Sequence, residues 1–488
     1  MSISTSIPTN FHIRDADLGS ILVSREYLST TYRSLIDDRT RSDAYWWGAN
    51  YSVYDSSPNG AINDDTRRLN YLQRESADWN SPSSTGNLFY TKEIVDIQHN
   101  QTVKVNPGWQ RRTTSFIASD GTLWMSGYNI YGQLGQPYSS GASYYQYFSR
   151  GAPFQVGSSN DWILCAPGRT ITMAIKRDGS LWAWGRNEDG IAGTGADTNN
   201  NTDITDWTHT FTPPTDITSL IKTSSIGPPL NTKWRHVSCG YRFAMFIDQE
   251  GYLYGSGKNN YGQLGNFGTT DSGGYMKRVY GSSSVPGYED KWRYVQAGVN
   301  SWIGIKEDGR LYGCGDLFGT SYPIELRERW DDFGRGYIHC DISHSHWAAI
   351  RNDGTLWTGG PYHFPTYRNA CYGQHQNFDF TDPPLVLNNR IGPAPSSSDP
   401  DGPGRILKVA GGPFRYVTCG FWFTILIGAD GRLYGYGNTL DLQLNPNSDL
   451  WIYQPQLLEY NKTVQYSNWR QVKAQDYGCM GLNSTQYM

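Results

Sequence analysis

Residues 251–266 read GYLYGSGKNNYGQLGN, and residues 121–136 repeat this stretch as GTLWMSGYNIYGQLGQ. Both copies follow an acidic residue. In both, leucine stands two positions after the first glycine, and an aromatic residue follows the leucine. A stretch of this length that recurs within one chain indicates a fold built from repeats, in which each repeat is one supersecondary unit.

The same pattern is found at six places in the chain. An acidic residue and a glycine are followed by leucine, then by Trp or Tyr, and then by a second glycine. The turn glycines are Gly121, Gly179, Gly251, Gly309, Gly354 and Gly431, and the second glycines are Gly127, Gly185, Gly257, Gly315, Gly360 and Gly437. An acidic residue and glycine between two apolar runs favour a β-hairpin turn, and a glycine within a strand marks a close approach of two backbones. We therefore predict six hairpins in which the leucine packs inward and the aromatic ring covers a neighbouring sheet.

A further short strand precedes several of these hairpins. It reads WRHVSCG at 234–240, WRYVQAG at 292–298 and WRQVKAQ at 469–475. Cys239 and Cys419 stand where other copies have alanine, so we expect both thiols to be small, buried, apolar groups. The distance between successive turns leaves room for a blade of four strands with loops of variable length. Longer insertions are expected near 136–160, 195–230, 266–290 and 361–405.

A seventh copy is divided between the two ends of the chain. The segment NWRQVKAQDYGCMGLNSTQYM at 468–488 matches the first half of the repeat and stops where the hairpin turn would come. The segment SDAYWWGANYS at 42–52 matches the missing half. We predict that the strand at 42–52 pairs with the strands at 467–488, which would remove the free sheet edge of an open ring.

The motif DGxLWxxGxNxxGQLG, preceded by WxxVxxG, resembles the repeats of the regulator of chromosome condensation family. The resemblance covers roughly 100–488 together with 42–52 and implies an all-β fold, a seven-bladed β-propeller spanning 42–488. Within that family the propeller serves as a guanine-nucleotide exchange factor, an enzyme inhibitor, a ubiquitin-ligase module or a part of virions, so the fold alone does not assign the function. The exchange factor carries a basic tail that this sequence lacks, and no catalytic residue is carried over from it.

The composition argues against several classes of function. The net charge is -4, and charged residues make up 18% of the chain, below a typical value of about 25%. No basic run offers a surface for nucleic acid or anionic membranes. No apolar stretch is long enough to insert into a membrane, and the N-terminus has no basic region like that of a secretory signal. The seven cysteines contain no CxxC pair, which argues against a disulfide framework and a zinc ribbon and fits a reducing compartment.

The loops between the first and second strands of each blade are expected to converge on one face, around the central channel. The expected ring is Arg111, Arg112, Arg169, Tyr241, Arg242, Phe243, Val299, Asn300, Ser301, His344, His346, Phe421, Trp422, Phe423 and Tyr477. Aromatic residues and arginine dominate protein-binding hot spots. The alternative is that several of these side chains fill the channel mouth as core.

Neither a metal nor a cofactor is predicted at this ring. His344 and His346 alternate onto one side of an extended segment, but no carboxylate stands at a suitable spacing for a metal site. The sequence holds no GxxxxGK[ST], HExxH or GxSxG motif, so we predict a non-enzymatic protein without a cofactor.

Residues 1–41 precede the propeller and are expected to form an anchoring arm. The segment DLGSILVSREYL resembles the opening of phage tail-fibre and other virion proteins, in which an arm docks the protein to the particle. The first hypothesis is therefore a virion structural protein, made in the host cytoplasm, whose propeller decorates a phage tail, collar, fibre or capsid. Residues 1–41 would bind other virion proteins, and the loops would contact a host surface protein or a glycan during host attachment.

The alternative is a cellular or secreted protein-binding propeller, an inhibitor or scaffold, with a cytoplasmic location. A guanine-nucleotide exchange factor is the third hypothesis, and the missing basic tail counts against it. None of the three predicts nucleic-acid binding or membrane insertion.

Overall fold

The computed structural model describes 40–49, 68–74, 93–100, 113–129, 131–135, 149–195, 210–222, 227–279, 291–326, 336–360, 407–409, 411–438, 444, 451–458, 468–474 and 478–486. The predicted arm at 1–41 lies outside these residues except for its last two, and so does the predicted insertion at 361–405. No helix in the described part of the chain is long and apolar enough to span a membrane.

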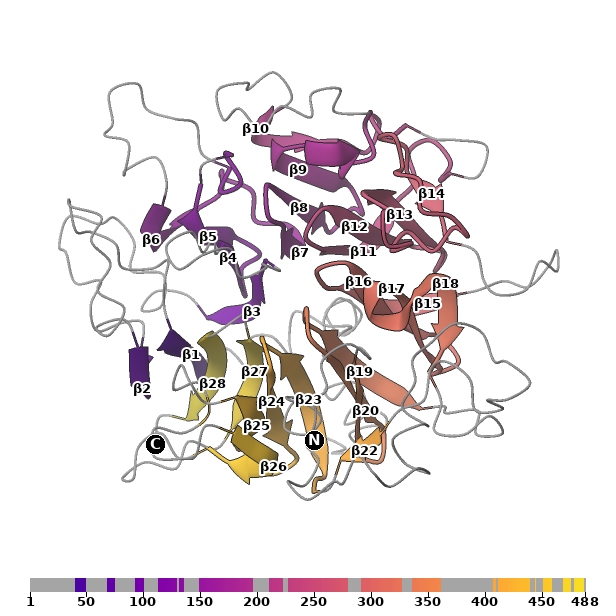
Figure 1. Cartoon of the computed structure of the whole chain (residues 1–488). Coiled ribbons are helices and arrows are strands. Elements are labelled where there is room, and N and C mark those ends of the chain that lie inside the picture. The colour runs from indigo at the N-terminus through magenta and orange to yellow at the C-terminus, as the bar shows by residue number, and fades with distance from the viewer. Residues whose placement is uncertain are drawn as a thin grey trace, which may run out of the picture.

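The described strands form seven four-stranded antiparallel sheets, which we number as blades, arranged around a common centre (Figure 1). Blades 1 to 3 are β3 (Ile94–His99), β4 (Thr113–Ala118), β5 (Leu123–Tyr128) and β6 (Ser149–Gln155); β7 (Trp162–Pro167), β8 (Ile171–Lys176), β9 (Leu181–Arg186) and β10 (Thr210–Asp216); and β11 (Trp234–Cys239), β12 (Phe243–Asp248), β13 (Leu253–Gly257) and β14 (Lys277–Arg278). Blades 4 to 6 are β15 (Trp292–Ala297), β16 (Ser301–Lys306), β17 (Leu311–Gly315) and β18 (Thr320–Glu325); β19 (Tyr337–Ile342), β20 (Trp347–Arg351), β21 (Leu356–Gly359) and β22 (Leu407–Val409); and β23 (Phe414–Cys419), β24 (Phe423–Gly428), β25 (Leu433–Asn438) and β26 (Trp451–Leu457). Two short 3-10 turns, η3 (Glu188–Gly190) and η4 (Asp316–Phe318), follow β9 and β17. The expectation of an all-β propeller of this type is confirmed.

Blade 7 joins the two ends of the described chain. It consists of β27 (Trp469–Ala474), β28 (Gly478–Gln486), β1 (Thr40–Ala49) and β2 (Arg68–Arg74). β1 pairs with β28 in an unbroken antiparallel register from Thr40 opposite Gln486 to Gly48 opposite Gly478. In Figure 1 the indigo β1 accordingly lies beside the yellow β28. The predicted closure is confirmed, although the strand spans Thr40–Ala49 rather than 42–52.

Each hairpin turn is organised by an aspartate and tied to the next blade by its glycine. The Oδ1 atom of Asp120, Asp178, Asp308, Asp353 and Asp430 accepts a hydrogen bond from the backbone N–H two residues further on. In blade 3 the sequence has Glu250 at this position, and Asp248 takes over by accepting from the backbone N–H of Tyr252 at 2.8 Å. The carbonyl oxygens of Gly121, Gly179, Gly251, Gly309, Gly354 and Gly431 accept from the backbone N–H of the first inner-strand residue of the following blade. The repeated dipeptide thus serves both the hairpin and the contact between blades.

The second glycine of each repeat allows a close backbone approach, as predicted. Five of the six have a positive φ, between 94° and 109°. A Cβ at Gly257 would lie 2.6 Å from the carbonyl oxygen of Arg242, and one at Gly185 would lie 2.5 Å from that of Thr170. Any other residue would displace the loop between the first and second strands of its blade.

The aromatic ring that follows the leucine packs against a neighbouring blade, as predicted. Tyr254 belongs to one buried cluster with Leu181 of blade 2, and Tyr312 to one with Leu253 of blade 3. Tyr254 meets Trp234 edge-on at 5.6 Å between ring centroids, and Tyr312 meets Trp292 at 5.4 Å, each within its own blade. The ring therefore has partners in two blades. The ring pairs with the first aromatic residue of its own inner strand, because the two positions lie on the same face of the sheet.

Three of the four expected insertions contain the outer strand of a blade. β6, β10 and β14 lie within 136–160, 195–230 and 266–290. An outer strand has one edge without a strand partner, and its sequence therefore shows a weaker apolar alternation.

The two aligned cysteines are buried as expected. Cys239 is 5% exposed and Cys419 is 2% exposed. Burial raises the pKa of the Cys239 thiol to about 12 and that of Cys419 well above its usual range. Both thiols are therefore protonated at neutral pH and act as apolar side chains.

Candidate functional site on the loop face

The antiparallel order of each blade separates two kinds of loop. Hairpin turns such as Ala429–Arg432 lie at one end of the strands, which we call the turn face. The loops between the first and second strands lie at the other end, which we call the loop face. The loop-face segments within the described residues are 168–170, 240–242, 298–300, 343–346 and 420–422. Arg111, Arg112 and Tyr477 lie outside the described residues, so their role stays a prediction.

An aromatic group spans blades 5 and 6 on the loop face. The rings of Phe421 and Trp422 lie 4.3 Å apart, and the ring of His344 is parallel to that of Phe421 at 6.0 Å. Ser345 links the two loops, because its Oγ accepts a hydrogen bond from the backbone N–H of Trp422 at 3.1 Å. All three rings are half-buried. We call His344, Phe421 and Trp422 the aromatic group.

Trp422 has a left-handed backbone, with φ at 64°. A bulky residue rarely adopts this conformation, and such strain is concentrated at functional sites. Next to it, burial lowers the pKa of His344, while Asp316 opposes this shift. The imidazole is therefore neutral at physiological pH, and the aromatic group presents ring surface without a net charge of its own.

Five residues of the expected ring lie in the core instead, and two of them, Val299 and Ser301, are 2% and 0% exposed. Phe243, Phe423 and His346 are completely buried. Phe243 and Phe423 open the second strands of their blades and face the second glycines Gly257 and Gly437 across the ladder. Side chains alternate along a strand, so a run of three ring residues that ends in a strand sends its last side chain into the core. These five residues support the loop face from beneath and do not form its surface.

His346 is a satisfied core histidine. Its Nε2 lies 2.7 Å from the Oγ1 of Thr424, and burial lowers its pKa to about 3. The expected pair of His344 and His346 therefore divides into one half-buried ring at the loop face and one core ring. In the described part of the chain, no three side chains of His, Cys, Asp or Glu gather as metal ligands would.

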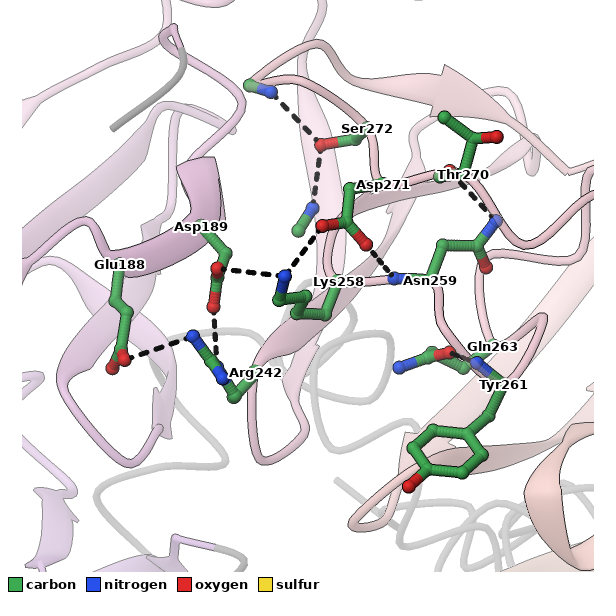
Figure 2. A network of polar contacts seen from close by, with 12 residues as sticks. Glu188, Asp189, Arg242, Lys258, Asn259, Tyr261, Gln263, Thr270, Asp271 and Ser272 are labelled. Atoms are coloured by element: carbon green, nitrogen blue, oxygen red, sulfur yellow. Dashed lines mark hydrogen bonds and ion pairs between the residues drawn. The ribbon is translucent and has the colours of Figure 1, made fainter. Parts of the chain in front are cut away.

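A network of ion pairs joins blades 2 and 3 on the loop face. Arg242 binds Asp189 through Nε at 2.6 Å and Glu188 through Nη2 at 3.2 Å. Lys258 lies 2.8 Å from Asp271 and 3.6 Å from Asp189. Figure 2 shows Asp189 between the two cations, and Lys258 between the two aspartates. Arg242, predicted as a partner contact, is thus held by carboxylates of its own chain.

Asp189 is the most buried member of this network, with a side chain that is 6% exposed. Burial raises the pKa of Asp189, and the guanidinium of Arg242 opposes that shift.

Arg169 extends this network of ion pairs. Its guanidinium lies 4.5 Å above the ring of Tyr241 and pairs with Glu188 at 3.5 Å. We call Arg169, Tyr241 and Arg242 the arginine group, whose two cations share Glu188.

The recurring glycine-rich stretch builds the loop beside this network. Asn259 accepts a hydrogen bond from the backbone N–H of Leu264 at 2.8 Å and donates to the carbonyl oxygens of Gly268 and Thr270. Gln263 accepts from the backbone N–H of Tyr261 at 2.9 Å, as Figure 2 shows. Asn129 and Asn187 make the matching bond in blades 1 and 2. The repeat motif itself therefore signalled this loop, although the site prediction did not use it.

The inner strands supply a second polar region that the sequence reasoning missed. Tilted rings in contact line the central channel in four successive blades, with centroid distances of 5.0 Å from His236 to Tyr294, 6.0 Å from Tyr294 to His339 and 4.3 Å from His339 to Tyr416. These residues occupy equivalent positions, two after the first residue of each inner strand. The sequence did contain a signal for this region. At this position of the inner strand it has polar and aromatic residues, where a buried strand would have aliphatic ones.

Comparison with known proteins agrees with this architecture. Two family models described as regulator of chromosome condensation (RCC1) repeat match residues 178–247 and 234–263. Protein RCC2 of Homo sapiens is 33% identical over 151 residues, which cover 30% of this chain and 24% of that protein. The ultraviolet-B receptor UVR8 of Arabidopsis thaliana is 27% identical over 208 residues, which cover 40% of this chain and 41% of the receptor. The matched segments thus span less than half the length of these relatives.

Two solved structures share the fold over most of the chain. Prp20p of Saccharomyces cerevisiae matches with a TM-score of 0.62 at 14% identity and covers 92% of each chain. Human WBSCR16 matches with a TM-score of 0.60 at 14% identity and covers 92% of this chain and all of its own. The chain is therefore an all-β propeller of the regulator of chromosome condensation type, and its segment 178–263 matches models of that repeat.

Proposed function

We propose that this chain is a protein-binding propeller, a regulator or scaffold, that engages its partner through the loop face. The observation that supports this most directly is the aromatic group, in which a strained Trp422 is held against Phe421 and His344. Rigid aromatic surface at a loop carries binding energy at a small entropic cost. Strain that the fold maintains at one loop fits a selected role for that loop.

The similar proteins favour this hypothesis over the virion hypothesis. Prp20p was studied for its binding to Gsp1p and histones, and yeast RCC1 (Prp20) has been solved bound to Kap60. These are partners of those proteins, and they support protein recognition by a propeller of this type. The virion location rests on residues 1–41, which lie outside the described residues except for the last two, and stays a prediction without support from these matches. The absence of enzymatic activity is likewise part of the proposal.

Site-specific cross-linking tests the proposal. A photoreactive residue is placed at position 422 on the loop face or at position 429 on the turn face of the full chain, in the native cells. We expect a discrete protein adduct from position 422 and not from position 429. The partner identified by mass spectrometry is then purified, and its affinity for the full chain is measured by calorimetry.

Trp422→Gly is the matched variant, because it removes the indole and glycine favours the left-handed backbone at this position. The loss of a hot-spot residue costs about 2 kcal/mol or more, which corresponds to an increase in Kd of about thirtyfold. The melting temperature should stay unchanged. Equal adducts from the two faces, or an unchanged Kd for Trp422→Gly, would contradict the proposal.

A further inference from the structure

A pocket of about 670 Å³ opens on the turn face of blade 3. Its wall combines the hairpin turn between β12 and β13, the turn that precedes β11 and one residue of β14. The charged and aromatic residues that line it are Lys233, Asp248, Glu250, Tyr252, Tyr254 and Arg278. Its volume lies within the range of about 300–1,000 Å³ that small-molecule sites occupy. The pocket is at the opposite end of the strands from the loop face, so it does not depend on the proposed function.

Two cations in the wall of this pocket are held in place by the fold. Arg278 lies on β14, and its guanidinium is 3.8 Å from the centre of the Tyr252 ring, as is the ammonium of Lys291. Within the described residues Arg278 has no ion pair with a carboxylate. Lys233 lies 3.8 Å from Asp178 of the preceding blade, which is a long ion pair. Both cations can therefore bind an anionic group that enters the pocket.

Two carboxylates line the same pocket. Asp248 is 4% exposed, and its oxygens accept from the Tyr252 backbone N–H at 2.8 Å and from the Tyr254 hydroxyl at 3.2 Å. Burial raises the pKa of Asp248, and these hydrogen bonds only partly oppose the shift. Glu250 is exposed, and neither carboxylate has an ion pair within the described part of the chain. A cation that enters the pocket would stabilise the buried carboxylate.

The equivalent position in two other blades shows what this place in the repeat can hold. Lys176 and Lys306 stand where blade 3 has Asp248, three residues before the turn glycine. Their ammonium groups lie 4.3 Å from the centre of the Trp182 ring and 4.2 Å from that of the Tyr312 ring. Blade 3 reverses the charge at this position, and no cation of the described chain forms an ion pair with Asp248. A cation for blade 3 must therefore come from a ligand.

The rim of the pocket adds an apolar surface. Thr232 donates to the carbonyl oxygen of Pro229 through its backbone N–H at 3.3 Å and through its hydroxyl at 2.7 Å, which fixes the turn. Leu230 lies in this turn, lines the pocket and is 73% exposed. An aliphatic group of a ligand would cover this side chain and remove apolar surface from water.

We propose that this pocket binds a zwitterion that carries one ammonium and one carboxylate, namely an aliphatic amino acid or a short peptide with both termini free. The ammonium binds to Asp248 and Glu250. The carboxylate binds to Arg278 and Lys233, and the aliphatic side chain covers Leu230. The lining has two charges of each sign, so it matches a ligand without net charge. A ligand with a single charge would meet two like charges as well as two opposite ones.

Calorimetry with the full chain tests the proposal. The zwitterions are L-leucine and leucyl-leucine, and the analogues of leucine with one charge are isoamylamine, which lacks the carboxylate, and isocaproate, which lacks the ammonium. We expect at least one zwitterion to bind about tenfold more tightly than both analogues, because each analogue loses a charged contact. The tighter zwitterion identifies the source as a free amino acid or a peptide. If neither zwitterion binds, or if one analogue binds equally well, the proposal is wrong.

Two variants assign the charges of the ligand to the two sides of the pocket. Glu250→Gln and Arg278→Gln each remove one charge from a side chain that is not buried, so the melting temperature should stay close to that of the parent. We expect each variant to bind the zwitterion about tenfold more weakly. Arg432→Gln, in the equivalent turn of blade 6, is the control and should leave the affinity unchanged. Unchanged affinity in Arg278→Gln or Glu250→Gln would overturn the proposed site.

Discussion

At the scale of single residues, the alternation of side chains along a strand determines which of two adjacent residues lies at the surface and which lies in the core. Trp422 and Phe423 are adjacent in the chain, yet the first is half-buried at the loop face and the second is completely buried. The boundary between them is the first residue of β24. The two aromatic residues therefore have opposite consequences when replaced.

We expect Phe423→Ala to lower the free energy of unfolding by about 3–5 kcal/mol, because it leaves a cavity in the core of blade 6. Trp422→Ala should cost less than about 1.5 kcal/mol, since its ring is partly in solvent. Urea unfolding followed by tryptophan fluorescence and circular dichroism measures both. Similar losses for the two variants would show that Trp422 is a core residue.

Buried histidines make the stability depend on pH. Burial lowers the pKa of His236 to about 4, while its Nε2 donates to the carbonyl oxygen of Val295 at 2.7 Å. Between an ordinary value of about 6.5 and about 4, the unfolded chain binds a proton that the folded chain does not. The free energy of unfolding therefore falls as the pH falls through this window, by up to about 1.4 kcal/mol per pH unit for this histidine.

His236→Gln isolates this contribution, because glutamine can keep a donor near Val295 and does not titrate. We expect the variant to lose stability less steeply than the parent between pH 6.5 and pH 4. Urea unfolding at several pH values gives both slopes. Parallel slopes would indicate that the His236 ring is protonated in the folded state.

At the scale of elements, the junctions between blades follow one rule with one exception. Six junctions use a turn glycine whose carbonyl oxygen accepts from the next inner strand. Blade 7 has no such turn, because the chain ends lie between β28 and β1. At its junction with blade 1, Gln471 accepts from the Ile97 backbone N–H at 2.9 Å and donates to Asp96 at 2.8 Å. Side-chain hydrogen bonds thus join blade 7 to blade 1.

Gln471→Leu should lower the free energy of unfolding by about 2–4 kcal/mol, because it leaves the Ile97 N–H and one oxygen of Asp96 without these partners. Arg470→Ala is the control at the same junction. Arg470 pairs with Glu93 at 2.9 Å, but its side chain is 43% exposed, so its loss should cost less than about 1 kcal/mol. Chemical denaturation compares the two. A larger loss for Arg470→Ala would contradict the role given to Gln471.

At the scale of the whole molecule, ring closure depends on a strand contributed by the first fifty residues. β1 pairs with β28 on one side and with β2 on the other. Without β1, the edge of β28 would be unpaired and β2 would lose its neighbour. An exposed edge invites pairing with other chains as well as local unfolding.

Two truncated chains, starting at residues 40 and 50, test the contribution of β1. We expect the chain that starts at residue 50 to unfold several degrees lower and to associate, since its ring has an open blade. Differential scanning calorimetry and light scattering report the two effects. Equal melting temperatures and equal masses would mean that β1 does not close the ring.

The sequence alone was sufficient to predict the repeat, the hairpin turns, the close backbone approach at the second glycines and the division of the last blade. These features follow from local chemistry, since an acidic residue with glycine forms a turn wherever it stands between two strands. Only the tertiary structure determined which groups surround the side chains of Arg242, Phe423 and Lys473. Their decisive neighbours come from other blades or from the far side of a strand: Asp189 for Arg242, the core of blade 6 for Phe423 and the channel cavity for Lys473. Sequence spacing does not record such contacts, because they exist only when separate blades converge on one axis.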